Sequence, residues 1–152
     1  MEKQLEIIHH TQESFIKLVD SLTEDQFNKI PVGFGNNIIW NFAHILASFH
    51  MLCYGRAGLA LSLDESFINN YKNGSKPEPH VSIAQYEVIK GLADKLIVKF
   101  KEDIASGVFN DFKPYTTMSG VSISSAEVAL QYVSMHHGLH LGYAMAMKKL
   151  VL

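Results

Sequence analysis

Histidines are the residues of this sequence best suited to chemistry, and there are eight of them in 152 residues. His136 and His140 are four residues apart, so on an α-helix their side chains lie about 40° apart around the axis and one turn apart along it. Two imidazoles at this spacing can bind one metal ion. Spacing alone is weak support, because eight histidines placed at random give about 0.4 such pairs.

Both histidines occur in a stretch without Asp, Glu, Lys or Arg, residues 128–147. We therefore expect them in or beside the core, where an unpaired polar ring is costly. His44 occurs in a second uncharged stretch, residues 30–55, on a semi-polar helical stripe with Asn41, Ser48 and Met51. If the two segments face each other, three neutral imidazoles would form a site with an open coordination position, which is typical of a catalytic ion.

The residues alone leave two questions open. His137 is three residues before His140 and would also be within reach of an ion on a helix, so spacing does not choose between His136 and His137. The histidines could also be core residues without a metal, hydrogen-bonded to backbone carbonyls or to Tyr132 and Tyr143. A metal site and a metal-free core are both compatible with the pattern.

The other candidate ligands are weaker. His50 is six residues after His44, about 120° around a helix, so these two would not share an ion. Cys53 is about 180° from His44 and is expected to be a small buried hydrophobe. The histidines expected at the surface are His9, His10 and His80.

The glycines and methionines near the histidine pair indicate how this segment packs. Gly138 and Gly142 lie on the face opposite His136 and His140, which indicates close approach of another helix, in the bundle or in a dimer. The methionines expected to fill the core are Met135, Met145 and Met147.

Four segments have the apolar periodicity of helices. Their expected ranges are about 2–22, 36 or 37 to 54, 82–107 and 122 or 124 to 149. Thr23 with Gln26, Ser82 with Gln85, and Ser124 with Glu127 have capping-box spacing. The first and third segments hold most of the charge, so the uncharged second and fourth should be the buried pair.

No run alternates with the period of two that a half-buried sheet needs. The sequence therefore predicts one all-α domain over residues 1–152, a four-helix bundle of up-and-down or crossover type. The two long connections, 59–81 and 107–121, exceed the usual length of a helix–helix link. Such connections often cover a site.

Composition excludes several classes of protein. Thirteen Lys and Arg against fifteen Asp and Glu give a net charge of −2 (13 − 15), without the basic excess that nucleic-acid binding needs. The uncharged stretches are long enough for membrane spans, but their histidines and asparagines would be expensive in lipid. A single cysteine excludes an intrachain disulfide, and without a signal-like start we expect a cytoplasmic protein.

Two motifs resemble the DinB/YfiT-like superfamily. A Trp-x-x-x-His segment, Trp40 to His44, is followed by a His-x-x-x-His-x-Gly segment, His136 to Gly142. The order and separation of the motifs match that family over essentially the whole chain. This sequence has Tyr143 after Gly142, where Gln is common in the family.

The resemblance implies that His44, His136 and His140 are the metal ligands. His137 stands where the family often has an acidic residue. The resemblance also implies a bundle with a crossover connection, a divalent ion such as zinc or nickel, and a homodimer. Family members with assigned reactions include S-transferases and an isomerase that use low-molecular-weight bacterial thiols.

These observations predict a metal-dependent enzyme that transfers such a thiol to a small electrophile, or that performs metal-assisted hydrolysis. Asn41 and Tyr143 are candidate groups for supporting a ligand or orienting a substrate. No Asp or Glu falls on the expected metal-facing stripes, so no protein general base is predicted. The competing hypotheses are a non-catalytic metal-binding or stress-response protein, and a metal-free bundle with hydrogen-bonded histidines.

Overall fold

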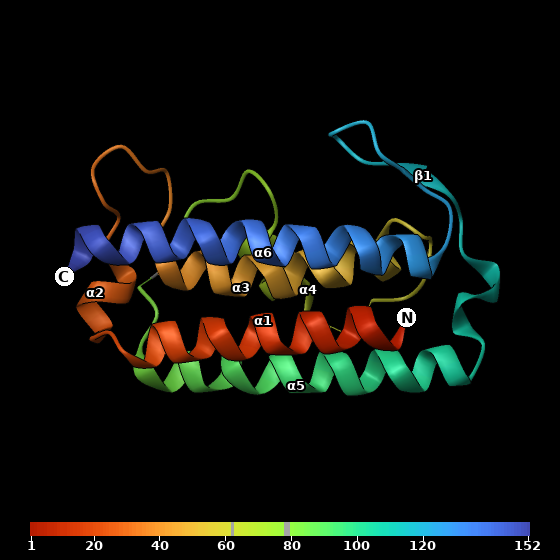
Figure 1. Cartoon of the computed structure of the whole chain (residues 1–152), viewed down its shortest axis with the longest axis horizontal. Coiled ribbons are helices and arrows are strands. Elements are labelled where there is room, and N and C mark those ends of the chain that lie inside the picture. The colour runs from red at the N-terminus through yellow and green to blue at the C-terminus, as the bar shows by residue number, and fades with distance from the viewer. Residues whose placement is uncertain (62, 78–79) are drawn as a thin grey trace.

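The computed structural model describes residues 1–61, 63–77 and 80–152. Four long helices within these ranges form a bundle (Figure 1): α1 (Glu2–Asp20), α3 (Ile38–His50), α5 (Ile83–Ala105) and α6 (Ala126–Val151). The colours of Figure 1 show α3 and α5 running in the same direction, so the chain crosses back along the bundle between them. The predicted all-α bundle with a crossover connection is confirmed.

The core lies between the four helices. α6 packs against α1 and α3, and α5 packs against the same two helices. Phe15 of α1 stacks on Phe42 of α3 at 5.3 Å between ring centroids, and Phe49 of α3 meets Phe100 of α5 edge-on at 5.3 Å. Every residue of α3 except Ser48 is buried, so the central position predicted for this uncharged helix is confirmed.

Helix starts follow the polar side chains that cap them. Asn37 caps α3 by accepting from the backbone N–H of Trp40 at 2.9 Å. The capping boxes predicted at Thr23 and Ser82 both form, and they open the short helix α2 (Glu24–Asn28) and α5.

The start predicted for α6 was wrong by one residue. Ser125, not Ser124, caps this helix and accepts from the N–H of Val128. The reason lies just before it, where the buried Ile123 pairs with Tyr115 across a small ladder and keeps the chain extended. The helix also continues past Lys149 to Val151.

Short elements occupy the connections. α3 continues into a π-helical turn, η1 (Met51–Gly55), and α4 (Glu65–Tyr71) lies in the crossover connection. After α5 come a 3₁₀ turn, η2 (Val108–Asp111), and a two-stranded antiparallel ladder of β1 (Tyr115–Thr116) and β2 (Ser122–Ile123). The prediction of no strand fails here because two-residue strands are too short to show an alternating pattern.

The outer face of α6 differs from the prediction. Only one side of this helix is buried, and Met135, Leu139 and Met145 are 53%, 63% and 55% exposed. The assignment of Met135 and Met145 to the core was therefore wrong, whereas Met147 is buried as predicted. Among the described residues, nothing lies within 4 Å of a Cβ placed on Gly138 or Gly142, so no described helix approaches them closely.

None of the helices in the described part of the chain is both long enough and apolar enough to cross a membrane.

Candidate metal centre

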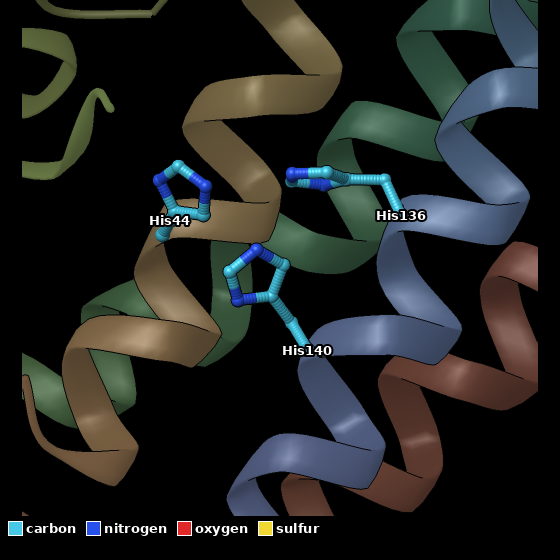
Figure 2. A group of neighbouring side chains, drawn as sticks. All are labelled: His44, His136 and His140. Atoms are coloured by element: carbon cyan, nitrogen blue, oxygen red, sulfur yellow. The ribbon is translucent and has the colours of Figure 1, made fainter. Parts of the chain in front are cut away.

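Three histidines from two helices point toward one another (Figure 2): His44 from α3, and His136 and His140 from α6. Their ring centroids are 4.5 Å apart for His136 and His140, 4.6 Å for His44 and His140, and 5.3 Å for His44 and His136. One nitrogen of each ring can be chosen so that all three atoms lie within 4.8 Å of one another. The residues that the resemblance singled out are thus brought together.

Hydrogen bonds hold the outer nitrogens of two of these rings. Nδ1 of His44 lies 2.6 Å from the backbone oxygen of Tyr71, the last residue of α4, and Nδ1 of His140 lies 2.8 Å from Oδ1 of Asn41. Since both oxygens only accept, each ring donates its Nδ1–H. Nε2 of His44 and of His140 therefore carries the lone pair that a metal ion needs.

The orientation of Asn41 is itself fixed. This fully buried side chain donates its amide N–H groups to the backbone oxygen of Asn37 at 2.7 Å and to Oδ1 of Asn36 at 2.9 Å. Its Oδ1 must then face His140, because the donor end of the amide is already occupied. Asn41 connects the start of α3 to the histidine pair on α6.

The polar atoms left over in the group fit an ion. Nδ1 of His136 is buried and has no hydrogen-bond partner among the described residues, which is costly unless a ligand pairs with it. Nε2 of His44 has one hydrogen-bond partner in the part of the chain that the structure describes, Oγ of Ser48 at 3.2 Å. Tyr132 stacks on His136, but its hydroxyl contacts Ser119 at 3.1 Å, so the described structure does not contain the alternative in which tyrosines pair with these histidines.

Burial keeps the three imidazoles neutral. It lowers the pKa of His136 to about 4 and that of His140 to about 3, with a smaller contribution from the neighbouring histidines. Burial also lowers the pKa of His44, against the opposing effect of the Tyr71 carbonyl. Neutral imidazoles are the metal-binding form, and three nitrogen donors suit Zn²⁺ or Ni²⁺.

The histidines form one wall of a pocket of about 510 Å³. This volume is in the range of small-molecule sites. Trp40 stacks on His44 at 4.6 Å and 10° and also lines the pocket. The other lining residues come from α3 and the residues just before it, from η1 and the residue after it, from the two residues after α4, from the turn between β1 and β2, and from α6.

Several predicted candidates lie elsewhere. His137 is fully buried on the α1 side of α6, with Nε2 3.5 Å from Nε2 of Gln12, so the helix geometry selects His136 over His137 for the group. His50 accepts from the N–H of Leu63 at 3.3 Å and is not part of the group. Tyr143 is 41% exposed and packs on Phe34, outside the pocket lining.

The remaining side chains follow the predictions. Cys53 is fully buried, and burial raises the pKa of its thiol, so it is not a reactive group. The histidines that pair with glutamates at the surface are His9, His10 and His80.

The long connections contribute to the site, as expected from their length: Lys72, Asn73, Thr117 and Met118 line the pocket. The sequence did not indicate which of their atoms would contact the histidines. The Tyr71 carbonyl that orients His44 is a backbone atom, and no residue pattern indicates it. Arg56 also lines the pocket. The sequence did contain a feature that could have indicated Arg56 as a site residue: it is the only arginine in the chain, and it directly follows the uncharged stretch that contains His44.

Comparison with known proteins supports the same architecture. A sequence model of the DinB superfamily matches residues 7–144, which include all three histidines of the group. No curated protein matches the chain significantly.

Proposed function

The chain belongs to the DinB superfamily, and we propose on that premise that it is an enzyme dependent on a divalent metal ion held by His44, His136 and His140. The single observation that carries the proposal is the convergence of these three neutral imidazoles beside a pocket of small-molecule size. Zinc or nickel are the proposed ions, because both accept nitrogen donors. Tyr71 and Asn41 would hold His44 and His140 in the ligating tautomer.

The proposed reaction is transfer of a low-molecular-weight thiol to a small electrophile. An ion held by His44, His136 and His140 would lower the pKa of a bound thiol or water and so supply a nucleophile at neutral pH. In the transfer, a bond forms between the thiol sulfur and an electrophilic carbon, the leaving group departs with its bonding electrons, and the thiol proton goes to solvent. Metal-assisted hydrolysis would use the same site with water in place of the thiol.

The protein residues would position the reactants rather than carry protons. None of the described residues that line the pocket is Asp or Glu, so we assign no protein general base. Trp40 and Ser48 flank His44 within the lining. Tyr143, predicted as an orienting group, would act only from outside the pocket, and we give it no role.

A homodimer through α6 is part of the proposal. The exposed apolar side chains on this helix include Met135, Leu139 and Leu150. Open space above Gly138 and Gly142 would let another helix approach closely. Because residues 128–147 include no Asp, Glu, Lys or Arg, two copies of this face could meet without burying a charged side chain from that stretch. The buried, unpaired Cys53 fits a reducing compartment such as the cytoplasm.

Metal content tests the proposal directly. We expect protein purified without a His tag to contain about one zinc or nickel per chain by elemental analysis, and His136→Ala and His140→Ala to lose it. The matched control is His80→Ala, which removes an exposed histidine outside the group. Wild-type protein without stoichiometric metal after incubation with zinc and with nickel would refute the proposal.

Turnover is the second measurement. Screening small electrophiles with bacterial thiols should reveal activity that His44→Ala loses while it stays folded by circular dichroism. Metal that stabilises the fold without any turnover would favour the non-catalytic alternative, in which chelation lowers thermal stability.

A further inference from the structure

The pocket beside the histidines is more basic than the protein as a whole. The chain has a net charge of −2, yet its only arginine, Arg56, lines this pocket together with Lys72. None of the described lining residues is acidic. The described lining therefore has an excess of positive charge from Arg56 and Lys72, to which an ion held by three neutral imidazoles would add.

The π-helical turn aims Arg56 into the pocket. In a continuous α-helix Arg56 would lie about 120° around the axis from His44, since twelve residues turn about 1200°. In η1 the N–H of Arg56 instead donates to the backbone oxygen of Met51, five residues earlier, at 2.8 Å. This wider turn returns the chain to the stripe of His44, Ser48 and Met51, all of which line the pocket with Arg56.

The guanidinium of Arg56 is supported without being neutralised. Its central carbon lies 5.8 Å from the ring centroid of Tyr115 in β1, and the Tyr115 hydroxyl is anchored by donating to the backbone oxygen of Leu52 at 2.6 Å. Neither Arg56 nor Lys72 pairs with a carboxylate within the described ranges; Nζ of Lys72 donates to Oδ1 of Asn69 at 2.8 Å. The N–H fork of Arg56 thus remains available to a ligand.

The rest of the lining is largely apolar. Trp40, Met51, Leu52 and Met118 are its large apolar members. A ligand that fills the pocket would therefore meet an apolar surface between the histidines and the arginine. This combination suits a molecule with an apolar body and one negatively charged end.

We propose that the substrate of this site carries an oxyanion group, a carboxylate or phosphate, which Arg56 binds through its guanidinium fork while the apolar part lies along Trp40 toward the three histidines. The guanidinium geometry matches both kinds of oxyanion. Lys72 adds a second positive charge. The inference rests on the proposed function in taking the same pocket as the reaction site, but it concerns binding and can be measured without turnover.

The test uses Trp40, the only tryptophan of the chain, as an internal fluorescent probe. Metal-free and zinc-loaded protein are each titrated with 3-phenylpropanoate, with its neutral amide 3-phenylpropanamide, and with 2-phenylethylphosphonate. We expect at least one oxyanion probe to bind about tenfold or more tightly than the amide to metal-free protein. The stronger of the two identifies the oxyanion.

Variants distinguish a specific contribution of the Arg56 guanidinium from a nonspecific effect of positive charge. Arg56→Gln should remove the preference over the amide, and Arg56→Lys should retain part of it, because a lysine keeps the charge without the fork. Lys95→Gln makes the same charge change at an exposed position on α5 outside the pocket and should bind as the wild type does. Circular dichroism establishes that each variant is folded.

The outcomes distinguish this inference from the proposed function. An Arg56-dependent preference in protein that binds no metal would support the inference and refute the metal-dependent enzyme. A protein that binds metal but has equal affinity for the oxyanions and the amide would support the metal site of the proposed function and refute the inference. A preference that survives in Arg56→Gln, or no measurable binding of either oxyanion to either form, would overturn the inference.

Discussion

Asn41 and His140 lie on different helices and are joined by a hydrogen bond of 2.8 Å between Oδ1 and Nδ1. Through this bond the N-terminal part of α3 fixes a ring on α6, even though His44 is the only member of the histidine group on α3. The asparagine is in turn held by Asn36 and by the Asn37 backbone. The rigid start of α3 is therefore coupled to the candidate metal centre.

Replacement of Asn41 should weaken metal binding without abolishing it. We expect Asn41→Ala to lower zinc affinity about 10- to 100-fold, because His140 loses the partner that fixes its tautomer and orientation. Competition with a chromophoric chelator measures the change. Tyr143→Phe, outside the pocket, is the control and should leave affinity unchanged. Unaltered zinc affinity in a folded Asn41→Ala protein would contradict the role given to this bond.

Metal-free protein should lose stability on mild acidification. Burial lowers the pKa of His136 and His50 to about 4 and that of His137 and His140 to about 3, whereas unfolded histidines titrate near their ordinary value of about 6.5. Between these values the unfolded chain binds more protons than the folded chain, so stability falls as pH falls. At higher pH both states are neutral at these groups.

Urea unfolding at a series of pH values checks this expectation. The free energy of unfolding should be nearly constant above about pH 7 and should decline as pH drops through 6 and 5, by on the order of 1 kcal/mol or more per pH unit once several histidines contribute. Zinc-loaded protein should resist acid further, until protons displace the ion. A curve that is flat from pH 7 to 5 would show that these imidazoles are not buried in the neutral form.

Much of the fold was predictable because its signals are local. The capping boxes at Thr23 and Ser82 form as predicted, since each depends on residues three positions apart, and the one at Ser82 places the start of α5. Of the two starts left open for α3, Asn36 and Asn37, the structure has the cap at Asn37, whereas the short helix α2 after Thr23 was not predicted.

The convergence of His136 and His140 follows from one helical turn. Spacing alone does not choose His136 over His137; the family resemblance made that choice, and the position of α6 against α1, with His137 facing Gln12, is its physical reason.

The parts that sequence reasoning missed depend on tertiary contacts. The π-helical turn at Met51–Gly55 has no distinctive residue pattern, and the Tyr71 carbonyl reaches His44 only because α4 folds back onto α3. Ser124 and Ser125 are equally good caps by type, and the extended pairing of Ile123 decides between them. The sequence predicted burial for the whole of α6 because the helix lacks charged residues over 128–147. Composition does not distinguish an apolar helix face that packs in a core from one that is exposed.

A second buried polar group should contribute to stability. The Tyr54 hydroxyl donates to Oδ2 of the buried Asp103 at 2.9 Å, and Nζ of Lys99 contacts the other carboxylate oxygen. Burial together with this carboxylate raises the pKa of Tyr54. Tyr54→Phe leaves Asp103 with one donor fewer, so we expect it to destabilise the fold by about 1–3 kcal/mol.

Chemical denaturation of Tyr54→Phe provides the measurement. Tyr143→Phe removes a hydroxyl from a more exposed ring and should change the unfolding free energy by less than about 0.5 kcal/mol. Similar small effects in both variants would mean that Asp103 draws its stabilisation from Lys99 alone.

The exposed face of α6 gives the last prediction, which concerns assembly. If two copies pair through this face, Leu139→Glu should produce a folded monomer, because each subunit would bring a carboxylate into an apolar contact. Light scattering coupled to size-exclusion chromatography measures the mass. Val88→Glu is the matched control, since Val88 is 67% exposed on α5 and Leu139 is 63% exposed on α6. The control should remain a dimer. A monomeric wild type would exclude the homodimer, and a dimer that persists in Leu139→Glu would place its interface away from this face.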